Sequence, residues 1–308
     1  MRNFKNKKIL ITGGAGFIGS NLSQKLLTYG SKITIVDKAR LNMPNVKSIK
    51  WDLSRFIFQD GLKEKFDFIF HLAGNSSASY SILEPVKDSE QNIQNTLMLL
   101  EALRKLKKSP LLIYFSSAAV YGISKRIPIK ESDPTFPLSP YGVSKLAAEK
   151  YVSVYCQNFG VEAVILRPFS VYGPGQKKQV VYDLIKKIQE NPKHLEVQDS
   201  PARSRDFIFI DDLIDAILLV ITKGTSDGDV YNVASGVPST LGKLVKIISQ
   251  LEKVSPKVKY LPLKTPFYQE RADISKLKAL GYKAKVSFFD GLKATKEWID
   301  NDTGNWPS

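Results

Sequence analysis

The stretch TGGAGFIG, residues 12–19, sets three glycines at intervals of three residues between an apolar segment and a longer amphipathic one. Glycines in this arrangement allow a tight turn, a backbone that approaches a pyrophosphate, and a helix that packs close to the preceding strand. The first turn of that helix offers free N–H groups and a partial positive charge to phosphate oxygens. We therefore predict a phosphate-binding loop whose contacts come from Gly13, Gly16, Phe17, Ile18 and Gly19.

Strands and helices alternate around this loop through the first half of the chain. Apolar segments of strand length alternate with longer segments whose apolar residues recur at helical spacing. This alternation predicts a parallel sheet with helices on both faces. The fold class is therefore α/β, with a Rossmann-type doubly wound parallel sheet. The predicted strands cover residues 7–12, 32–37, 46–53, 66–74, 111–117 and 162–168, and the predicted helices cover residues 16–29, 92–107 and 141–159.

The pattern changes after about residue 168, where loops rich in proline, glycine and charge surround shorter elements. The segment FIFI, residues 207–210, precedes a helix over 211–222, and we expect it to return to the first sheet. From about residue 235 the pattern is typical of a smaller C-terminal α/β lobe. The predicted division comprises a dinucleotide-binding domain (1–168 with 206–234), a substrate-binding lobe (169–205 with 235–300) and a loose tail (301–308).

Composition limits the classes of protein to which the chain belongs. Of its 308 residues one is cysteine, which excludes an internal disulfide and is typical of a reducing compartment. No apolar run approaches the roughly 20 residues that span a bilayer. Glycines interrupt the first apolar stretch too early for a leader peptide. We predict a cytoplasmic protein with no membrane segment.

The formal net charge is +15, and its lysines are spread over the whole chain. They form no basic helix and no patch interleaved with aromatic residues, which would indicate nucleic-acid binding. We therefore predict a solvated lysine-rich surface, whose positive field favours an anionic small substrate. The two histidines, His71 and His194, are expected to be structural or superficial, and we predict no metal site.

An acidic residue, Asp37, ends the second predicted strand. A carboxylate at this position accepts hydrogen bonds from both ribose hydroxyls of a dinucleotide and repels the 2′-phosphate of NADP. The predicted cofactor is therefore NAD. Lys38 and Arg40 follow closely, which leaves some tolerance of NADP open.

Eight motifs in order identify the chain as similar to a known family. They are TGGAGFIG, WDL at 51–53, HLAG at 71–74, SSAAVYG at 116–122, YGVSK at 141–145, RPFSVYGPGQ at 167–176, RDFIFIDDL at 205–213 and YNVASG at 231–236. Together they resemble the extended short-chain dehydrogenase/reductase family, in its nucleotide-sugar epimerase and dehydratase branch. The resemblance covers nearly the whole chain, and its motifs are specific for the family but not for the substrate.

The resemblance implies roles for matching residues on the cofactor side. Asp52 and Leu53 would contact the adenine, and the segment that ends the fourth strand would line the cofactor. Tyr141 and Lys145 match the family's Tyr-xxx-Lys pair, and Ser117 matches its Ser or Thr. The remaining expected cofactor contacts are Leu72, Ala73, Gly74 and Ser116, together with Tyr141 and Lys145 themselves.

On the substrate side, the resemblance implies that Arg205 binds the pyrophosphate of a nucleotide sugar. Ser170 stands where many relatives have an asparagine that contacts the phosphates. A further arginine that often clamps the pyrophosphate has no obvious counterpart, and Lys264 or Arg271 is the candidate replacement. Ser76 lies in a serine-rich loop that either touches the sugar or is a plain polar loop.

The catalytic chemistry requires a base for a sugar hydroxyl. A free tyrosine has a pKa of about 10 and is a poor base at neutral pH. Tyr141 and Lys145 are four residues apart on a predicted helix, hence on one face, where the ammonium favours the phenolate. Lowering the pKa by about three units takes roughly 4 kcal/mol. Ser117 would hold the reacting oxygen.

Ala118 and Ala119 narrow the reaction. In related dehydratases these positions hold an Asp and a Glu that eliminate water, whereas alanines move no proton. This favours an NAD-dependent epimerase that inverts C4 of a UDP-hexose through a 4-keto intermediate. The alternatives are an NAD(P)H-dependent reductase of a 4-keto-6-deoxy nucleotide sugar and a non-catalytic NAD-sensing protein. Apolar helix faces over 92–106 and 143–157 suggest a homodimer, as in the resembled family, or simply cover the sheet.

Overall fold

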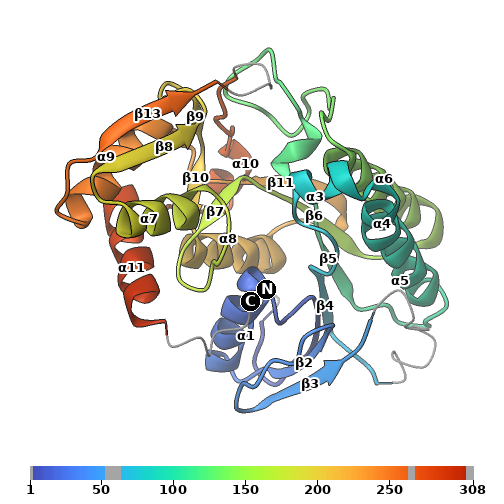
Figure 1. The fold of residues 1–308 in the computed structure, drawn as a ribbon. Helices are drawn as coiled ribbons and strands as arrows, with labels where there is room; N and C mark the ends of the chain where they lie inside the picture. Colours follow the sequence, from blue (N-terminus) through green and yellow to red (C-terminus); the bar gives the residue numbers. More distant parts are fainter. Residues whose placement is uncertain (1–2, 53–63, 263–267, 303–308) are drawn as a thin grey trace.

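A seven-stranded parallel sheet forms the centre of the computed structural model, which describes residues 3–52, 64–262 and 268–302 (Figure 1). Its strand order is β11-β6-β5-β4-β1-β2-β3, and every neighbouring pair is parallel. This confirms the predicted Rossmann-type fold. The strands are β1 (Lys8–Thr12), β2 (Lys32–Asp37), β3 (Val46–Lys50), β4 (Phe68–His71), β5 (Leu111–Phe115), β6 (Ala163–Pro168) and β11 (Asp227–Val233).

Two layers of helices bury the two faces of this sheet. Successive side chains of a strand point to opposite faces, so Ile9 and Ile11 of β1 join one core cluster while Leu10 joins the other. The central strands are continuous apolar runs because both of their faces are covered. On one face lie α1 (Phe17–Thr28) and α8 (Ile210–Lys223), and on the other lie α5 (Asn95–Leu103) and α6 (Pro140–Phe159).

The strand order creates a switch point beside β1. From β1 the chain passes to β2 on one side, whereas β4 lies on the other side. The connections that leave the carboxyl ends of β1 and β4 therefore diverge, and they leave a crevice in which such sheets bind ligands. The segments that follow β1, β4, β5 and β6, including the starts of α1 and α6, carry most of the predicted site residues.

The prediction that FIFI returns to the central sheet is wrong. The strand β10 (Phe207–Phe209) pairs with β7 (Ser170–Tyr172) in a separate two-stranded sheet. Three residues are too few to cross the central sheet, and α8 begins directly afterwards. The seventh strand is β11, whose half-polar sequence DGDVYNV carries a weak strand signal.

The helix predicted over 92–107 also differs. A short helix α4 (Pro85–Ser89) leads into a π-helical turn η2 (Glu90–Gln94), and α5 follows and ends at Leu103. A π turn contains one extra residue, and such turns are frequent at functional sites. Here the turn contains Asn92, whose amide donates hydrogen bonds to Asp88 and Ser144.

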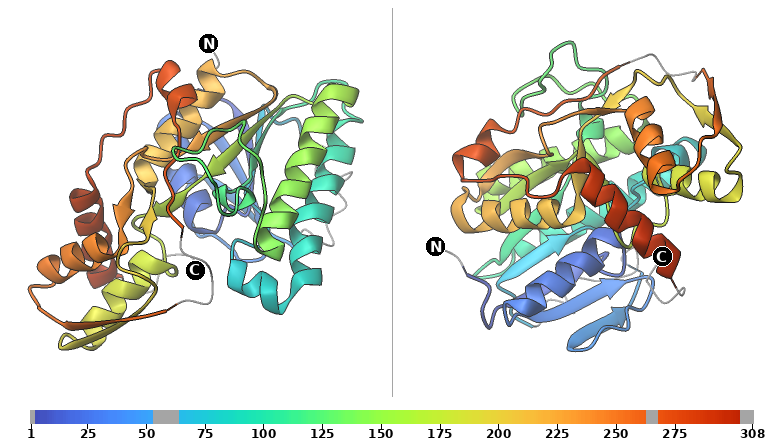
Figure 2. Two further views of the ribbon diagram at one scale, coloured as in Figure 1. Left: turned by 90° about the horizontal axis from the view of Figure 1, so that it is seen from above. Right: turned by 90° about the vertical axis from the view of Figure 1, so that its left-hand side faces the viewer.

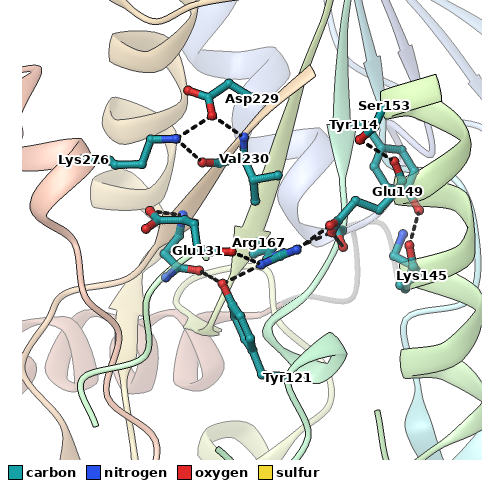
Figure 3. Close-up of polar contacts among 12 residues, drawn as sticks. Tyr114, Tyr121, Glu131, Lys145, Glu149, Ser153, Arg167, Asp229, Val230 and Lys276 are labelled. Atoms are coloured by element: carbon teal, nitrogen blue, oxygen red, sulfur yellow. Dashed lines mark hydrogen bonds and ion pairs between the residues drawn. The ribbon is translucent and has the colours of Figure 1, made fainter. Parts of the chain in front are cut away.

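The outer edge of β11 is bonded by side chains instead of by another strand (Figure 3). The Glu131 carboxylate accepts from the Asn232 N–H at 3.0 Å, and the Lys276 ammonium donates to the Val230 carbonyl at 2.8 Å. Lys276 also pairs with Asp229 at 2.6 Å. These contacts satisfy backbone groups that an edge strand leaves open.

A smaller group of elements lies beside the sheet, opposite α5 and α6 (Figures 1 and 2). In it β8 (His194–Gln198) pairs with β13 (Lys257–Leu261), and β9 (Ser204–Arg205) pairs with β12 (Ser239–Thr240). The predicted domain boundaries stay a prediction. The helices of this group and the remaining short helices are α7 (Val180–Glu190), α9 (Leu241–Leu251), α10 (Ser275–Ala279), α11 (Phe288–Asn301), α3 (Ala78–Leu83) and the 3₁₀ turn η3 (Ala118–Val120). No helix in the described ranges is both long and apolar enough to cross a membrane.

His71, at the end of β4, makes stability depend on pH. Its ring is buried between the hydroxyls of Thr12 (2.7 Å) and Thr96 (3.1 Å), and burial lowers its pKa to about 3. Between pH 6.5 and 3 the unfolded chain binds a proton that the folded chain does not, so stability falls with pH by about 1.4 kcal/mol per unit. We expect His71→Asn to flatten this slope in denaturant titrations between pH 6 and 4.

The matched control is His194→Asn, because the His194 side chain is exposed on β8 and meets water in both states. An unchanged slope in His71→Asn would show that other groups cause the acid sensitivity.

Candidate active site

The loop after β1 has the geometry that a phosphate-binding turn requires. Gly13 has φ +72°, and a Cβ there would lie 2.6 Å from the backbone nitrogen of Ala73. A Cβ on Gly19 would lie 2.6 Å from Cα of Gly14. No side chain caps the N-terminus of α1 at Gly16. The first N–H groups of this helix therefore have no partner within the helix, and they fit a phosphate.

Asp37 lies at the carboxyl end of β2 and faces the glycine turn. Its Oδ2 accepts from the Ala15 N–H and its Oδ1 from the Ala39 N–H, both at 3.0 Å. These bonds fix the carboxylate and leave lone pairs for ribose hydroxyls. Asp52 forms an ion pair with Lys38 at 3.4 Å, and Leu53 lies outside the described residues.

The segment after β4 approaches the same turn. The Leu72 N–H donates to the Thr12 carbonyl at 3.0 Å, and Ala73 packs against Gly13. Gly74 has φ +141°, and a Cβ there would lie 2.2 Å from Oδ1 of Asn92. This buried Oδ1 accepts no hydrogen bond within the described chain. A buried acceptor without a donor, beside a glycine cradle, indicates a place for a bound polar group.

The predicted catalytic residues come together at the start of α6. Ser139 caps this helix and Pro140 begins it, so that Tyr141 and Lys145 lie one turn apart on one face. Ser117, which starts η3, forms a side-chain hydrogen bond with Tyr141. Lys145 is buried, with its ammonium 5.1 Å from the centre of the Tyr114 ring.

The chain alone does not provide the lowered tyrosine pKa that we expected. Burial raises the pKa of Tyr141 and the Asp88 carboxylate raises it further, while the Ser117 hydrogen bond opposes them. Burial also lowers the pKa of Lys145 to about 8, against the charges of Asp88 and Glu149. Desolvation penalises the charged form of both groups. In the chain without a cofactor, burial therefore decides the pKa of Tyr141, although Lys145 lies one helical turn away.

A buried ion pair connects α6 to β6 (Figure 3). Glu149, one turn after Lys145, binds Arg167 of β6 through both carboxylate oxygens, with Nε donating at 3.0 Å. Ser116 also donates to this carboxylate, at 2.8 Å. Its hydroxyl is thus held by Glu149, although we had predicted a cofactor contact. Arg167 further donates to the Tyr121 hydroxyl at 2.7 Å.

Sequence reasoning missed a second buried carboxylate. Asp88 of α4 accepts hydrogen bonds from Asn75, Asn92 and Ser144. Only its spacing, four residues before Asn92 in a helical segment, could have indicated it. Asp88 and Glu149 are the two carboxylates whose charges act on Lys145.

The residues predicted to bind the nucleotide are spread over the second lobe. Arg205 is half-buried on β9, Ser170 is half-buried on β7, and Arg271 is exposed. Ser76 is exposed and accepts from Lys178 at 3.3 Å. Lys264 lies outside the described residues. Among the described residues, these four predicted side chains form no hydrogen bond with one another.

The sequence analysis also overlooked Arg203, two residues before Arg205. It is buried, forms an ion pair with Asp199 and stacks 4.5 Å from the centre of the Tyr268 ring. Glu270 is half-buried nearby; burial raises its pKa, and the charge of Arg205 opposes this. Within the described ranges, no group of three or more metal-ligating side chains comes together.

Residues 9–234 match the model of the NAD dependent epimerase/dehydratase family. The chain belongs to this family. A curated relative, the putative UDP-glucose 4-epimerase of Methanocaldococcus jannaschii, is 30% identical over 96% of this chain and 99% of its own. The human dTDP-D-glucose 4,6-dehydratase is 29% identical over 97% of this chain and 92% of its own.

Solved structures agree with the family assignment. The UDP-N-acetylglucosamine 4-epimerase from Methanobrevibacter ruminantium, solved with UDP-N-acetylmuramic acid, superposes with a TM-score of 0.89. It is 32% identical and the match covers 96% of this chain and 99% of that one. The comparisons confirm the predicted family and NAD as the cofactor. The individual site residues stay predictions.

The residues around the glycine turn have the chemistry that is needed to bind NAD. The glycine turn and the first turn of α1 would hold the pyrophosphate, and Asp37 would hold the adenosine ribose. Oδ1 of Asn92, which accepts no hydrogen bond from the described residues, lies beside Gly74, one of the predicted cofactor contacts.

Asp37 provides a test of cofactor selectivity. We expect Asp37→Asn to raise the Kd for NAD by about 10- to 100-fold, since hydrogen bonds to a charged group contribute about 1.5–3 kcal/mol. The Kd for NADP should change less, because the repulsive charge disappears with the hydrogen bonds. Calorimetry with both cofactors on cofactor-stripped protein measures the two constants. An unchanged ratio of the two Kd values would contradict the role of Asp37.

Proposed function

We propose that the protein is an NAD-dependent epimerase that inverts C4 of a UDP-hexose through a 4-keto intermediate. The observation that supports this most strongly is the site itself. Ser117, Tyr141 and Lys145 come together where β5 and α6 meet the crevice, while Ala118 and Ala119 follow without any carboxylate. The relatives include 4-epimerases as well as a dehydratase.

The chain's own residues would carry the proton steps. When bound, NAD supplies the reversible hydride acceptor and the positive charge of its nicotinamide ring. Ser117 orients the C4 hydroxyl, and Tyr141 removes its proton as the carbon is oxidised. Lys145 stabilises the resulting phenolate by its charge. After the 4-keto sugar rotates in the pocket and presents its other face, Tyr141 returns the proton to the C4 oxygen.

The two alanines explain why the reaction stops at epimerisation. They lie on η3, a short 3₁₀ turn that packs against the start of α6, where a Cβ on Gly142 would approach the Ala119 carbonyl to 2.8 Å. Removal of water from a 4-keto sugar requires an acid and a base near C5 and C6. Methyl groups at 118 and 119 supply neither.

The nucleotide would bind in the second lobe. The half-buried Arg205 suits a diphosphate, because a guanidinium forms paired hydrogen bonds with phosphate oxygens. The net charge of +15 favours the approach of such an anion. We propose Ser170, Ser76 and Arg271, with Lys264, as the other contacts to the nucleotide sugar. A cytoplasmic location remains our prediction from the single cysteine.

We propose that two copies associate through α5 and α6. These helices lie side by side on the outer face, away from the second lobe (Figure 2). Large apolar side chains on α6 are exposed there: Val143 by 52%, Val154 by 43% and Phe159 by 48%. Met98 of α5 (36%) and Tyr151 of α6 (41%) are exposed as well. Exposed apolar side chains on two adjacent helices support a protein interface there.

The function predicts turnover without added cofactor. We expect purified protein, monitored by NMR with a panel of UDP-sugars, to form the C4-inverted partner of one of them. Tyr141→Phe should reduce kcat by about 100-fold or more, because the general base is lost, while bound NAD remains. Turnover only of 4-keto sugars with NAD(P)H would replace the proposal by the reductase. NAD binding without turnover of any of these sugars would support a sensing protein.

The interface predicts a change in mass. We expect Val154→Asp to convert a species of about twice 34.5 kDa into a monomer in light scattering, because a carboxylate in an apolar interface lacks a partner. Phe289→Asp is the matched control, since Phe289 is equally exposed (45%) on the distant α11. A monomeric wild type, or a dimeric Val154→Asp, would exclude this interface.

A further inference from the structure

Asp88 is a fully buried carboxylate whose role the reaction scheme leaves open. It lies on α4, which packs against the first turns of α6, and its exposed fraction is 0%. Its Oδ1 accepts from Nδ2 of Asn75 at 2.6 Å and of Asn92 at 3.1 Å. Its Oδ2 accepts from the Ser144 hydroxyl at 2.6 Å. Three neutral donors thus hold the carboxylate in one position.

Among the described side chains, the charge of Asp88 has no cation in direct contact. In the ranges that the structure describes, no basic side chain forms an ion pair with it. Glu149, the other buried carboxylate beside Lys145, is instead neutralised by the two-pronged contact with Arg167. A buried negative charge is costly unless a cation compensates it. The cation that responds most directly to Asp88 is Lys145, the residue after Ser144.

We propose that Asp88 is a positioning residue whose uncompensated charge keeps Lys145 cationic and sets the pH range in which the Tyr141–Lys145 pair works. The inference rests on the catalytic role given to that pair. Ser144 connects Asp88 and Tyr141, because its Oγ lies 2.6 Å from Oδ2 of Asp88 and 3.0 Å from the Tyr141 carbonyl oxygen, and its one hydroxyl proton is shared between them.

One charge acts here on both members of the pair and in the same direction. The Asp88 carboxylate raises the pKa of Lys145 and also that of Tyr141. Activity requires a deprotonated tyrosine beside a protonated lysine, so the tyrosine limits it on the acid side and the lysine on the alkaline side. Removal of the charge therefore moves both limits to lower pH.

Other titratable groups face the same space and do not replace Asp88. Burial keeps His71 neutral at neutral pH by lowering its pKa to about 3, and raises the pKa of Tyr114 well above its ordinary value. Lys87 is exposed and pairs with Glu84 at 3.2 Å. The groups on the elements packed around Asp88 and Lys145 are His71, Tyr80, Glu84, Lys87, Glu90, Tyr114, Tyr141, Glu149 and Arg167.

The isosteric variant Asp88→Asn removes the charge and keeps the contacts. Its remaining oxygen still accepts from Asn75 and Asn92. Its new amide donates to the Ser144 oxygen, and the Ser144 proton is then free to donate to the Tyr141 carbonyl alone. Ser144→Ala is the matched control, because it removes the hydrogen bond between Ser144 and Asp88 and leaves the charge in place.

The test reads Lys145 directly by NMR titration of cofactor-bound protein labelled with [ε-13C]lysine, with the signal identified by its loss in Lys145→Arg. We expect Asp88→Asn to lower the Lys145 titration midpoint by about one pH unit or more, and Ser144→Ala to move it by much less. The kcat profile of Asp88→Asn should shift to lower pH on both limbs. An unchanged midpoint, or an equal shift in Ser144→Ala, would overturn the proposal.

A measurement on the wild type covers the case in which Asp88→Asn does not fold. The carboxyl 13C signal of Asp88 should show an inflection at the Lys145 midpoint, because loss of the lysine charge changes the electric field at this carbon. A signal that stays flat through that midpoint would overturn the proposal. The two NMR readouts use resting protein, so they are independent of whether the proposed UDP-hexose is the substrate.

Discussion

The buried pair of Glu149 and Arg167 is the contact on which the catalytic site depends. Glu149 belongs to the helix that carries Tyr141 and Lys145, and Arg167 belongs to the strand β6 in the middle of the main core. Ser116, the neighbour of Ser117, joins the same carboxylate. One fixed-geometry contact thus holds three segments that are far apart in sequence. A deeply buried ion pair is stable only when its remaining hydrogen-bonding groups also have partners. Here the Tyr121 hydroxyl and the Glu131 carbonyl accept hydrogen bonds from Arg167.

The polar groups below α6 are not equivalent. Glu149 is neutralised by Arg167 and fixes the position of α6 against β6. Asp88 contacts only neutral donors, so its charge acts on Lys145. The enclosure that makes these charges effective also opposes the ionisation of Tyr141. Burial thus disfavours the Tyr141 phenolate in the chain alone, and the positive nicotinamide ring of a bound NAD would favour it.

The sequence was sufficient to predict the parts of the fold that depend on local pattern. The glycine turn, the strand runs and the Tyr141–Lys145 spacing each involve residues close together in the chain. The wrong assignments depended on partners distant in sequence. FIFI is as apolar as a central strand, but it pairs with β7, at residues 170–172, which lies far from it in the chain. Arg203 and Asp88 are single polar residues in ordinary contexts, and only the fold shows that they are buried.

The side chains that bond the outer edge of β11 have a consequence for the behaviour of the protein in a concentrated solution. Open strand edges recruit strands of other molecules and so begin aggregation. On β11 this route is blocked by Glu131 and Lys276, which occupy the backbone groups at Asn232 and Val230. The opposite edge, β3, carries Lys47 and Lys50, and lysines on an edge strand disfavour its pairing with another strand. The sheet can thus remain seven strands wide even when many chains crowd together.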